Sequence, residues 1–131
     1  MIVVDTSALM AILLGEAQAD ACMTTLETAG TLAISTGTVA EALIVADRRN
    51  LGKEMRRLLD GLGFEFESVS PAEAQRVAEA YARWGKGIHP AGLNFGDCFA
   101  YSLAMQFDVP LLFVGDDFAR TDVRQALQAA A

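Results

Sequence analysis

The sequence lacks the residues that build several familiar kinds of catalytic and structural site. Of its 131 residues, two are cysteines (Cys22 and Cys98), which form neither a disulfide framework nor a metal-type pair, and one is a histidine, His89. It has no Ser-His-Asp set, no glycine-rich phosphate loop and no CxxC motif. We therefore expect two buried thiols in a protein of the reducing cytoplasm, and carboxylates as the candidates for any chemistry.

Long hydrophobic runs are also missing. No apolar run approaches the roughly 18 residues of a membrane-spanning helix, and the N-terminus has neither the basic start nor the cleavage region of a signal peptide. With 53% hydrophobic and 21% charged residues, the composition is that of a globular protein. We expect one domain over residues 1–131, without membrane contact.

Positive charge is scarce and unevenly placed. Ten Lys and Arg residues face seventeen Asp and Glu residues, and the net charge of −7, taken alone, argues against a nucleic-acid partner. Five of the ten basic residues nevertheless fall between positions 48 and 57. Arg49, Lys53 and Arg56 would share a helical face if one helix continued through them, and we predict that they contact RNA. The alternative is an ordinary solvated helix surface.

Helical and strand patterns alternate along the chain. Apolar runs and turn residues predict strands at 2–4, 31–35, 64–69 and 109–115, and helices at 7–15, 16–30, 38–50, 52–63, 71–85 and 97–108. A short C-terminal helix is expected after residue 115. Ser70, Pro71 and Glu73 are typical of a capping box, and Val77, Tyr81 and Trp84 mark one apolar face of the helix that follows. This alternation predicts an α/β domain with a mainly parallel sheet.

Acidic residues stand where such a sheet binds ligands. Asp5 follows the first apolar strand, and the pair Asp116/Asp117 follows the last, at the carboxyl ends where ligands of parallel sheets sit. Glu41 has apolar neighbours on every side, and Asp97 opens a helix.

Each acidic residue also has an ordinary structural explanation. Asp5 could cap the next helix, Asp97 could favour the helix dipole, and Glu41 could be partly exposed or ion-paired. If all of them converge on one cleft, they need protons or cations, and all-oxygen sites suit Mg²⁺ or Mn²⁺. Such a site could hydrolyse a phosphodiester.

The chain resembles the PIN-domain ribonucleases, and among them the VapC toxins of VapBC toxin–antitoxin pairs. The resemblance lies in MIVVDTSAL, the lone glutamate in VAEAL, LNFGDCFAYSLA and LLFVGDDFARTDV, which cover essentially the whole chain in order. It implies a PIN-like fold, with the parallel sheet flanked by helices on both faces. It also implies a Mg²⁺- or Mn²⁺-dependent endoribonuclease acting on RNA, a homodimer, and a VapB-like antitoxin that blocks the cleft.

The resemblance assigns roles to particular residues. Asp5, Glu41 and Asp97 match three core acidic positions of the family, and Asp5 and Asp97 match its direct metal ligands. The fourth acidic position falls on Asp116 or Asp117, with a slight preference for Asp116 because it comes first after the strand. Ser7 matches a small hydroxyl residue that supports Asp5.

Two other functions compete with this interpretation. A haloacid-dehalogenase-like phosphatase also places an aspartate after strand one, but its DxDx[TV] pattern needs a second aspartate where this chain has Ser7. A PIN-like module without catalysis, binding RNA or protein, would normally lack one of the acidic residues, and none is missing here.

Overall fold

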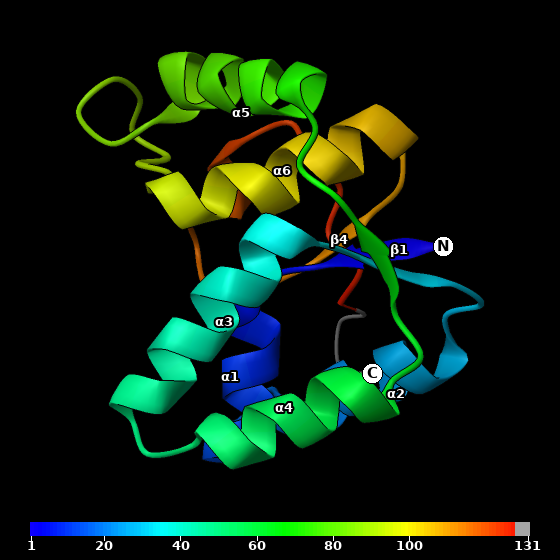
Figure 1. Ribbon diagram of the computed structural model, residues 1–131. Coiled ribbons are helices and arrows are strands. Elements are labelled where there is room, and N and C mark those ends of the chain that lie inside the picture. Colours follow the sequence, from blue (N-terminus) through cyan, green and yellow to red (C-terminus); the bar gives the residue numbers. More distant parts are fainter. Residues whose placement is uncertain (128–131) are drawn as a thin grey trace.

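A parallel β-sheet of four strands forms the centre of the computed structural model, which describes residues 1–127 (Figure 1). The strands lie in the order β3-β2-β1-β4, and each neighbouring pair is parallel. They are β1 (Ile2–Val4), β2 (Leu32–Ser35), β3 (Glu65–Glu67) and β4 (Leu111–Leu112). The helices are α1 (Thr6–Leu14), α2 (Ala19–Thr28), α3 (Thr36–Arg48), α4 (Gly52–Gly61), α5 (Pro71–Trp84), α6 (Phe95–Phe107) and the 3₁₀ helix η1 (Phe118–Arg120). The predicted α/β class is confirmed.

The carboxyl ends of β1 and β4 meet at one edge of the sheet, because these strands pair in parallel. The strand expected over 109–115 is shorter than predicted, since side chains satisfy the backbone groups beyond β4. Ser7 Oγ accepts a hydrogen bond from the Val114 amide at 3.0 Å, and Gln125 Nε2 donates to the Phe113 carbonyl at 3.0 Å. The chain therefore leaves the sheet beside the end of β1.

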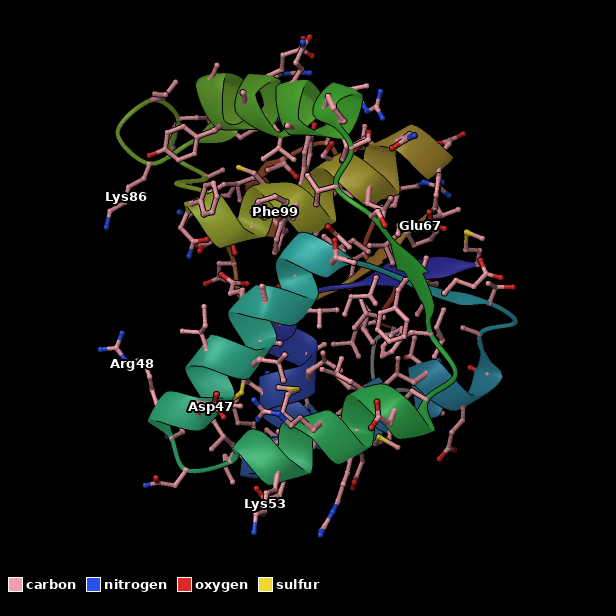
Figure 2. All side chains as sticks on the ribbon, in the orientation of Figure 1. Asp47, Arg48, Lys53, Glu67, Lys86 and Phe99 are labelled. Atoms are coloured by element: carbon pink, nitrogen blue, oxygen red, sulfur yellow. The ribbon has the colours of Figure 1, made fainter. Side chains whose placement is uncertain are left out.

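A turn separates α3 from α4, so these are two separate helices (Figure 2). Asn50 has a positive φ of 59°, a conformation that asparagine tolerates better than most residues. The single helical face proposed for Arg49, Lys53 and Arg56 is therefore wrong. Arg56 Nη1 instead lies 2.9 Å from Asp47 Oδ1, in an exposed ion pair across the break.

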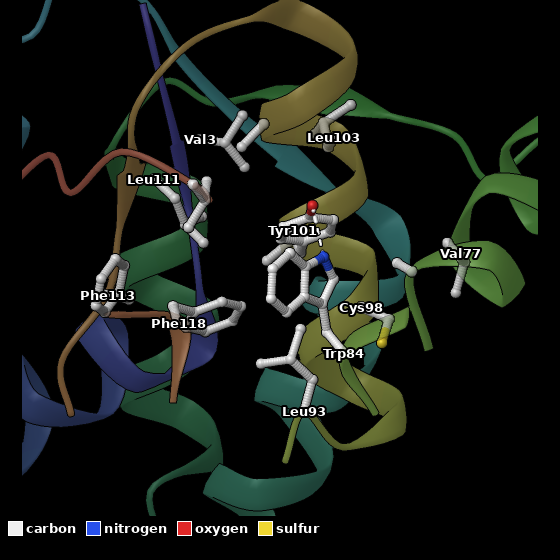
Figure 3. Packing of buried hydrophobic residues seen from close by; sticks show 14 of the residues in the cluster. Val3, Val77, Trp84, Leu93, Cys98, Tyr101, Leu103, Leu111, Phe113 and Phe118 are labelled. Carbon is white, nitrogen blue, oxygen red and sulfur yellow. Dashed lines mark hydrogen bonds between the residues drawn. The ribbon is translucent and has the colours of Figure 1, made fainter. Parts of the chain in front are cut away.

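Helices cover both faces of the sheet, and each face has its own hydrophobic cluster. Val3 points into the cluster formed with α5 and α6, where Trp84 and Phe113 are buried (Figure 3). Ile2 and Val4 point to the opposite face, into the cluster formed with α1, α2, α3 and α4. This alternation follows from the two-residue period of a strand. The same alternation determines to which face of the sheet the side chains at the end of β1, just before α1, point.

The start of α5 differs in one respect from the sequence pattern. Ser70 caps the helix as expected, with its hydroxyl accepting from the Glu73 amide at 3.1 Å. The Glu73 carboxylate does not close a capping box. It turns inward, where it accepts from Ser102 Oγ at 2.7 Å and from Arg76 Nε at 2.9 Å.

Tyr81, expected in the core, is 38% exposed because α5 turns other residues towards α6.

The segment after β4 forms only the 3₁₀ turn η1, and residues 121–127 contain no helix. The backbone of Gln125 makes an isolated bridge to Leu111, which covers the free edge of β4. Residues 128–131, where the rest of the expected C-terminal helix would fall, lie outside the described residues. Cys22 and Cys98 are free and buried, as predicted. Across residues 1–127, every helix is too short or too polar to cross a membrane.

Candidate active site

Asp5 both caps a helix and presents a carboxylate oxygen to the site. It is the N-cap of α1, and its Oδ2 accepts a hydrogen bond from the Ser7 amide at 2.9 Å. The side chain is only 2% exposed, and Oδ1 has no hydrogen-bond partner among residues 1–127. The cap uses Oδ2 alone, so the two explanations of Asp5 that the sequence left open are compatible.

The environment of Asp5 favours its protonated form. Burial raises the pKa of Asp5 from 3.8 to about 7, against the hydrogen bonds from Ser7, which lower it. The negative charges of Asp97 and Glu41 raise the pKa further. Three acidic residues that are far apart in the sequence therefore act on one another at the carboxyl end of β1.

Ser7 makes hydrogen bonds both to Asp5 and to the segment after β4. Its amide donates to Asp5, and its hydroxyl oxygen accepts the Val114 amide at 3.0 Å. This second hydrogen bond joins α1 to the segment that leads from β4 to Asp116 and Asp117. Ser7 thus links two of the elements that carry the acidic residues.

Glu41 reaches the site from α3 and is held from α1. Thr6 Oγ1 donates to Glu41 Oε1 at 2.7 Å, and Thr6 itself is buried. The other carboxylate oxygen lies against Gly96 of α6, where a Cβ atom would overlap it. Glu41 is therefore in contact with two of the elements that carry Asp5 and Asp97.

Asp97 occupies the third position of α6 and forms a capping box with Asn94. The Asn94 amide donates to Asp97 Oδ2 at 2.9 Å, and the Asp97 amide donates to Asn94 Oδ1 at 2.8 Å. Burial raises the pKa of Asp97 to about 6, the Asn94 hydrogen bond lowers it, and the charges of Glu41 and Asp117 raise it. Asp97 does stand at a helix start, as its structural explanation had it. The capping box with Asn94 holds its carboxylate in place.

Asp116 and Asp117 are both exposed, but they differ in their electrostatic effect. Asp117 precedes η1, and its charge is one of those that raise the pKa of Asp97. Asp116 is not among them. Of the two residues, Asp117 is thus the one whose charge acts on Asp97, although the sequence gave a slight preference to Asp116 as the fourth acidic residue.

Sequence reasoning missed two residues that shape the site, Asn94 and Gly96, and it missed the contact of Thr6 with Glu41. The spacing Asn94-x-x-Asp97 is a readable signal for a capping box. The hydrogen bond of Thr6 to Glu41 spans 35 residues, so no local pattern reveals it. The role of Gly96 depends on how closely α3 approaches α6.

The residues present fit a hard divalent cation. Within residues 1–127, no three His, Cys, Asp or Glu side chains are grouped as a ready-made metal site. Mg²⁺ does not require such a group, since it keeps several waters and binds through one or two carboxylates plus substrate phosphates. The partnerless Asp5 Oδ1 and the raised pKa values of Asp5 and Asp97 are what a bound cation would relieve.

The chain is similar to known proteins over nearly its whole length. The family model described as PIN domain matches residues 2–124. Ribonuclease VapC42 of Mycobacterium tuberculosis is 40% identical over 128 residues, which are 95% of this chain and 98% of that protein. Among solved structures, VapC20 of M. tuberculosis, described as a sarcin–ricin loop cleaving toxin, has a TM-score of 0.76 at 15% identity and covers 94% of this chain and 96% of its own.

A toxin–antitoxin complex from Klebsiella pneumoniae has a TM-score of 0.69 at 20% identity and covers 93% of each chain. These two structures are similar in fold, and the family model and VapC42 match nearly the whole sequence. The stretches that match contain Asp5, Glu41 and Asp97. The chain therefore belongs to the PIN-domain family and, within it, to the VapC ribonucleases.

Proposed function

We propose that this protein is a Mg²⁺-dependent endoribonuclease, with Mn²⁺ as a possible substitute, and the toxin of a toxin–antitoxin pair. The observation that carries the proposal is Asp5, a buried carboxylate with one oxygen lacking a partner among residues 1–127 and two further carboxylates close enough to raise its pKa. A divalent cation would stabilise all three charges. The proposal includes a homodimer and a location in the cytoplasm. Sedimentation equilibrium would test the homodimer.

Each residue of the site has a distinct task in this proposal. Asp5, through Oδ1, and Asp97 would hold the cation, which when bound polarises the phosphodiester, lowers the pKa of a water and stabilises the leaving oxygen. Ser7 and Asn94 orient these two carboxylates. Glu41, oriented by Thr6, would accept a proton from the attacking water. We assign the fourth acidic position to Asp117.

Cleavage of RNA by the purified chain tests the function. We expect cleavage in Mg²⁺, none after chelation, and recovery when Mg²⁺ is restored. A binding module without catalysis would bind RNA and leave it intact under all three conditions. A phosphatase would release phosphate from a small phosphomonoester instead, although membership of the PIN family speaks against that alternative.

The basic segment after α3 gives a prediction about RNA. Reversing the charges of Arg49 and Lys53 should weaken RNA binding, because fewer counterions are released when fewer phosphates are contacted. The magnitude of the slope of log K against log salt should fall by about 1.4 for two lost contacts with single-stranded RNA. Arg56 should matter less, since its guanidinium pairs with Asp47.

A filter-binding titration at several salt concentrations measures this slope. Reversal of Lys86 and Arg124, both exposed and in other parts of the chain, changes the net charge equally and serves as control. Equal slopes for the two double variants would show that Arg49 and Lys53 are only solvated surface charges.

A groove beside Glu41 suits the antitoxin. It has a volume of about 270 Å³, lies between α3 and α6, and is lined mainly by apolar side chains such as Ile44, Phe95 and Phe99. Ile44 is 60% exposed and Phe95 is 71% exposed, while Glu41 places negative charge in the groove lining. A VapB-like helix with an apolar face and an arginine would fill the groove and pair with the carboxylates.

We expect Ile44→Asp to weaken antitoxin binding at least tenfold, because a charge would enter the apolar groove. Ile88→Asp is the matched control, since Ile88 is 56% exposed and lies outside the groove. Binding is measured by calorimetry without Mg²⁺, with the product of the adjacent gene as the partner. Equal losses in both variants, or hydrogen-exchange protection only on a face remote from Glu41, would contradict cleft blocking.

A further inference from the structure

Helices α3 and α6 approach each other through a reciprocal pair of glycines. Gly37 of α3 faces the ring of Phe99 on α6, and Gly96 of α6 faces the carboxylate of Glu41 on α3. A Cβ atom built on either glycine would overlap the group it faces. Figure 2 shows Phe99 on α6 beside the first turn of α3. The two contacts differ in one respect, since Phe99 is a bulky ring and Glu41 ends in a flexible carboxylate.

Glu41 is held from two sides at this contact. Thr6 Oγ1 donates a hydrogen bond to Oε1 at 2.7 Å, which fixes one oxygen. Oε2 and Cδ lie where a side chain on Gly96 would be, so the absence of that side chain gives the carboxylate its place beside α6. Gly96 is buried and helical, and its φ is not positive, so its backbone does not require glycine.

We propose that Thr6 and Gly96 are positioning residues, which hold the Glu41 carboxylate next to Asp97, Thr6 through its hydroxyl and Gly96 by lacking a side chain. This inference rests on the proposed nuclease function for its effect on catalysis. The contacts of Glu41 with Thr6 and Gly96 are present without a metal, so they can be tested in the metal-free protein. Gly96 is glycine because of the position of Glu41, and not because of helix geometry.

Gly96→Ala is the decisive variant. The added methyl should push the carboxylate end of Glu41 away, since that end is flexible, and the helices should keep their places. We expect the kcat of RNA cleavage to fall at least tenfold with little change in KM. Gly61→Ala is the matched control, because Gly61 also lies in a helix, at the end of α4, and has nothing within 4 Å of its would-be Cβ. It should leave kcat unchanged.

Thermal unfolding of the metal-free protein supplies a readout that does not depend on activity. Alanine is more favourable than glycine in a helix, so Gly96→Ala should raise Tm by about 3 °C once nothing opposes the methyl. In the Glu41→Ala background the space is empty, and this increase should appear in full. In the wild-type background it should be reduced or reversed, because Glu41 must move.

Thr6 is tested by two substitutions that differ in the hydroxyl. Thr6→Val keeps the shape and removes the donor, and it should lower kcat about tenfold. Thr6→Ser keeps the donor and should restore kcat to within twofold of wild type. Equal Tm changes for Gly96→Ala in both backgrounds, or full kcat in both Gly96→Ala and Thr6→Val, would overturn the inference. An inactive wild-type chain would refute the nuclease function, while the Tm comparison would still decide the positioning.

Discussion

Asp5→Asn is expected to lower the rate of RNA cleavage by roughly 10²-fold or more, the scale on which single electrostatic groups act in catalysis. Asparagine keeps the shape of the side chain and can still accept the Ser7 amide that now bonds Oδ2 at 2.9 Å. The cap of α1 should therefore survive. What is lost is the negative charge at Oδ1, which has no partner among residues 1–127.

Cleavage is measured under single-turnover conditions at limiting Mg²⁺. Asp60→Asn makes the same chemical change on the exposed surface of α4 and should leave the rate within twofold of wild type. Asp97→Asn should resemble Asp5→Asn, because Asp97 is the second proposed ligand. Near-normal cleavage by Asp5→Asn would remove this residue from the site.

The metal-free protein is expected to lose stability as the pH rises from about 4 to about 7. Asp5 has a pKa of about 7 in the folded chain, whereas the pKa of a free aspartate side chain is 3.8. Between these values the unfolded chain has released its proton and the folded chain has kept it, so rising pH favours unfolding. Above about pH 7 both forms are ionised and the loss levels off. Its size is up to about 4 kcal/mol, at 1.36 kcal/mol per pKa unit.

Comparison with Asp5→Asn isolates this contribution from those of other groups. Urea unfolding in a chelating buffer should give similar stabilities for the two proteins near pH 4 and a more stable variant at pH 8. Asp97, whose pKa is raised to about 6, adds a smaller loss of the same sign to both proteins. A difference between the proteins that is independent of pH would mean that Asp5 is not buried as a charge at neutral pH.

The strand-end position of Asp5 was readable from the sequence, because a charged residue closes a short buried strand in an alternating α/β pattern. The sequence presented its two roles, cap and site, as alternatives. In the structure, Oδ2 makes the cap, and Oδ1 is left without a hydrogen-bond partner among residues 1–127. Local pattern cannot reveal such a division, since it depends on which oxygen accepts the Ser7 amide and which is left without a partner.

Other features of the site depend on contacts between distant elements. Thr6 and Glu41 are 35 residues apart, and Gly96 matters only because α3 crosses close to α6. The same dependence on distant contacts explains why the predicted length of the last strand was wrong. The strand before Asp116 is short because Ser7, at the other end of the chain, accepts the Val114 amide.

The condition for a shared helical face of Arg49, Lys53 and Arg56, one continuous helix, is not met for a local reason. Asn50 has a positive φ and the chain breaks there, so Arg49 and Lys53 lie on either side of a turn. Helix propensity and charge spacing alone suggested a common face. The turn residue was the competing signal, and it determined the outcome.

The central claim is that Asp5 and Asp97 hold one divalent cation, and calorimetric titration of the metal-free chain with Mn²⁺ tests it most directly. At pH 6, binding should release protons, because the raised pKa values of Asp5 and Asp97 leave these groups partly protonated before the metal binds. We predict that wild type binds one Mn²⁺ per chain with proton release, and that Asp5→Asn and Asp97→Asn each weaken binding at least tenfold. Equal Mn²⁺ affinity and equal proton release in wild type and Asp5→Asn would contradict the account.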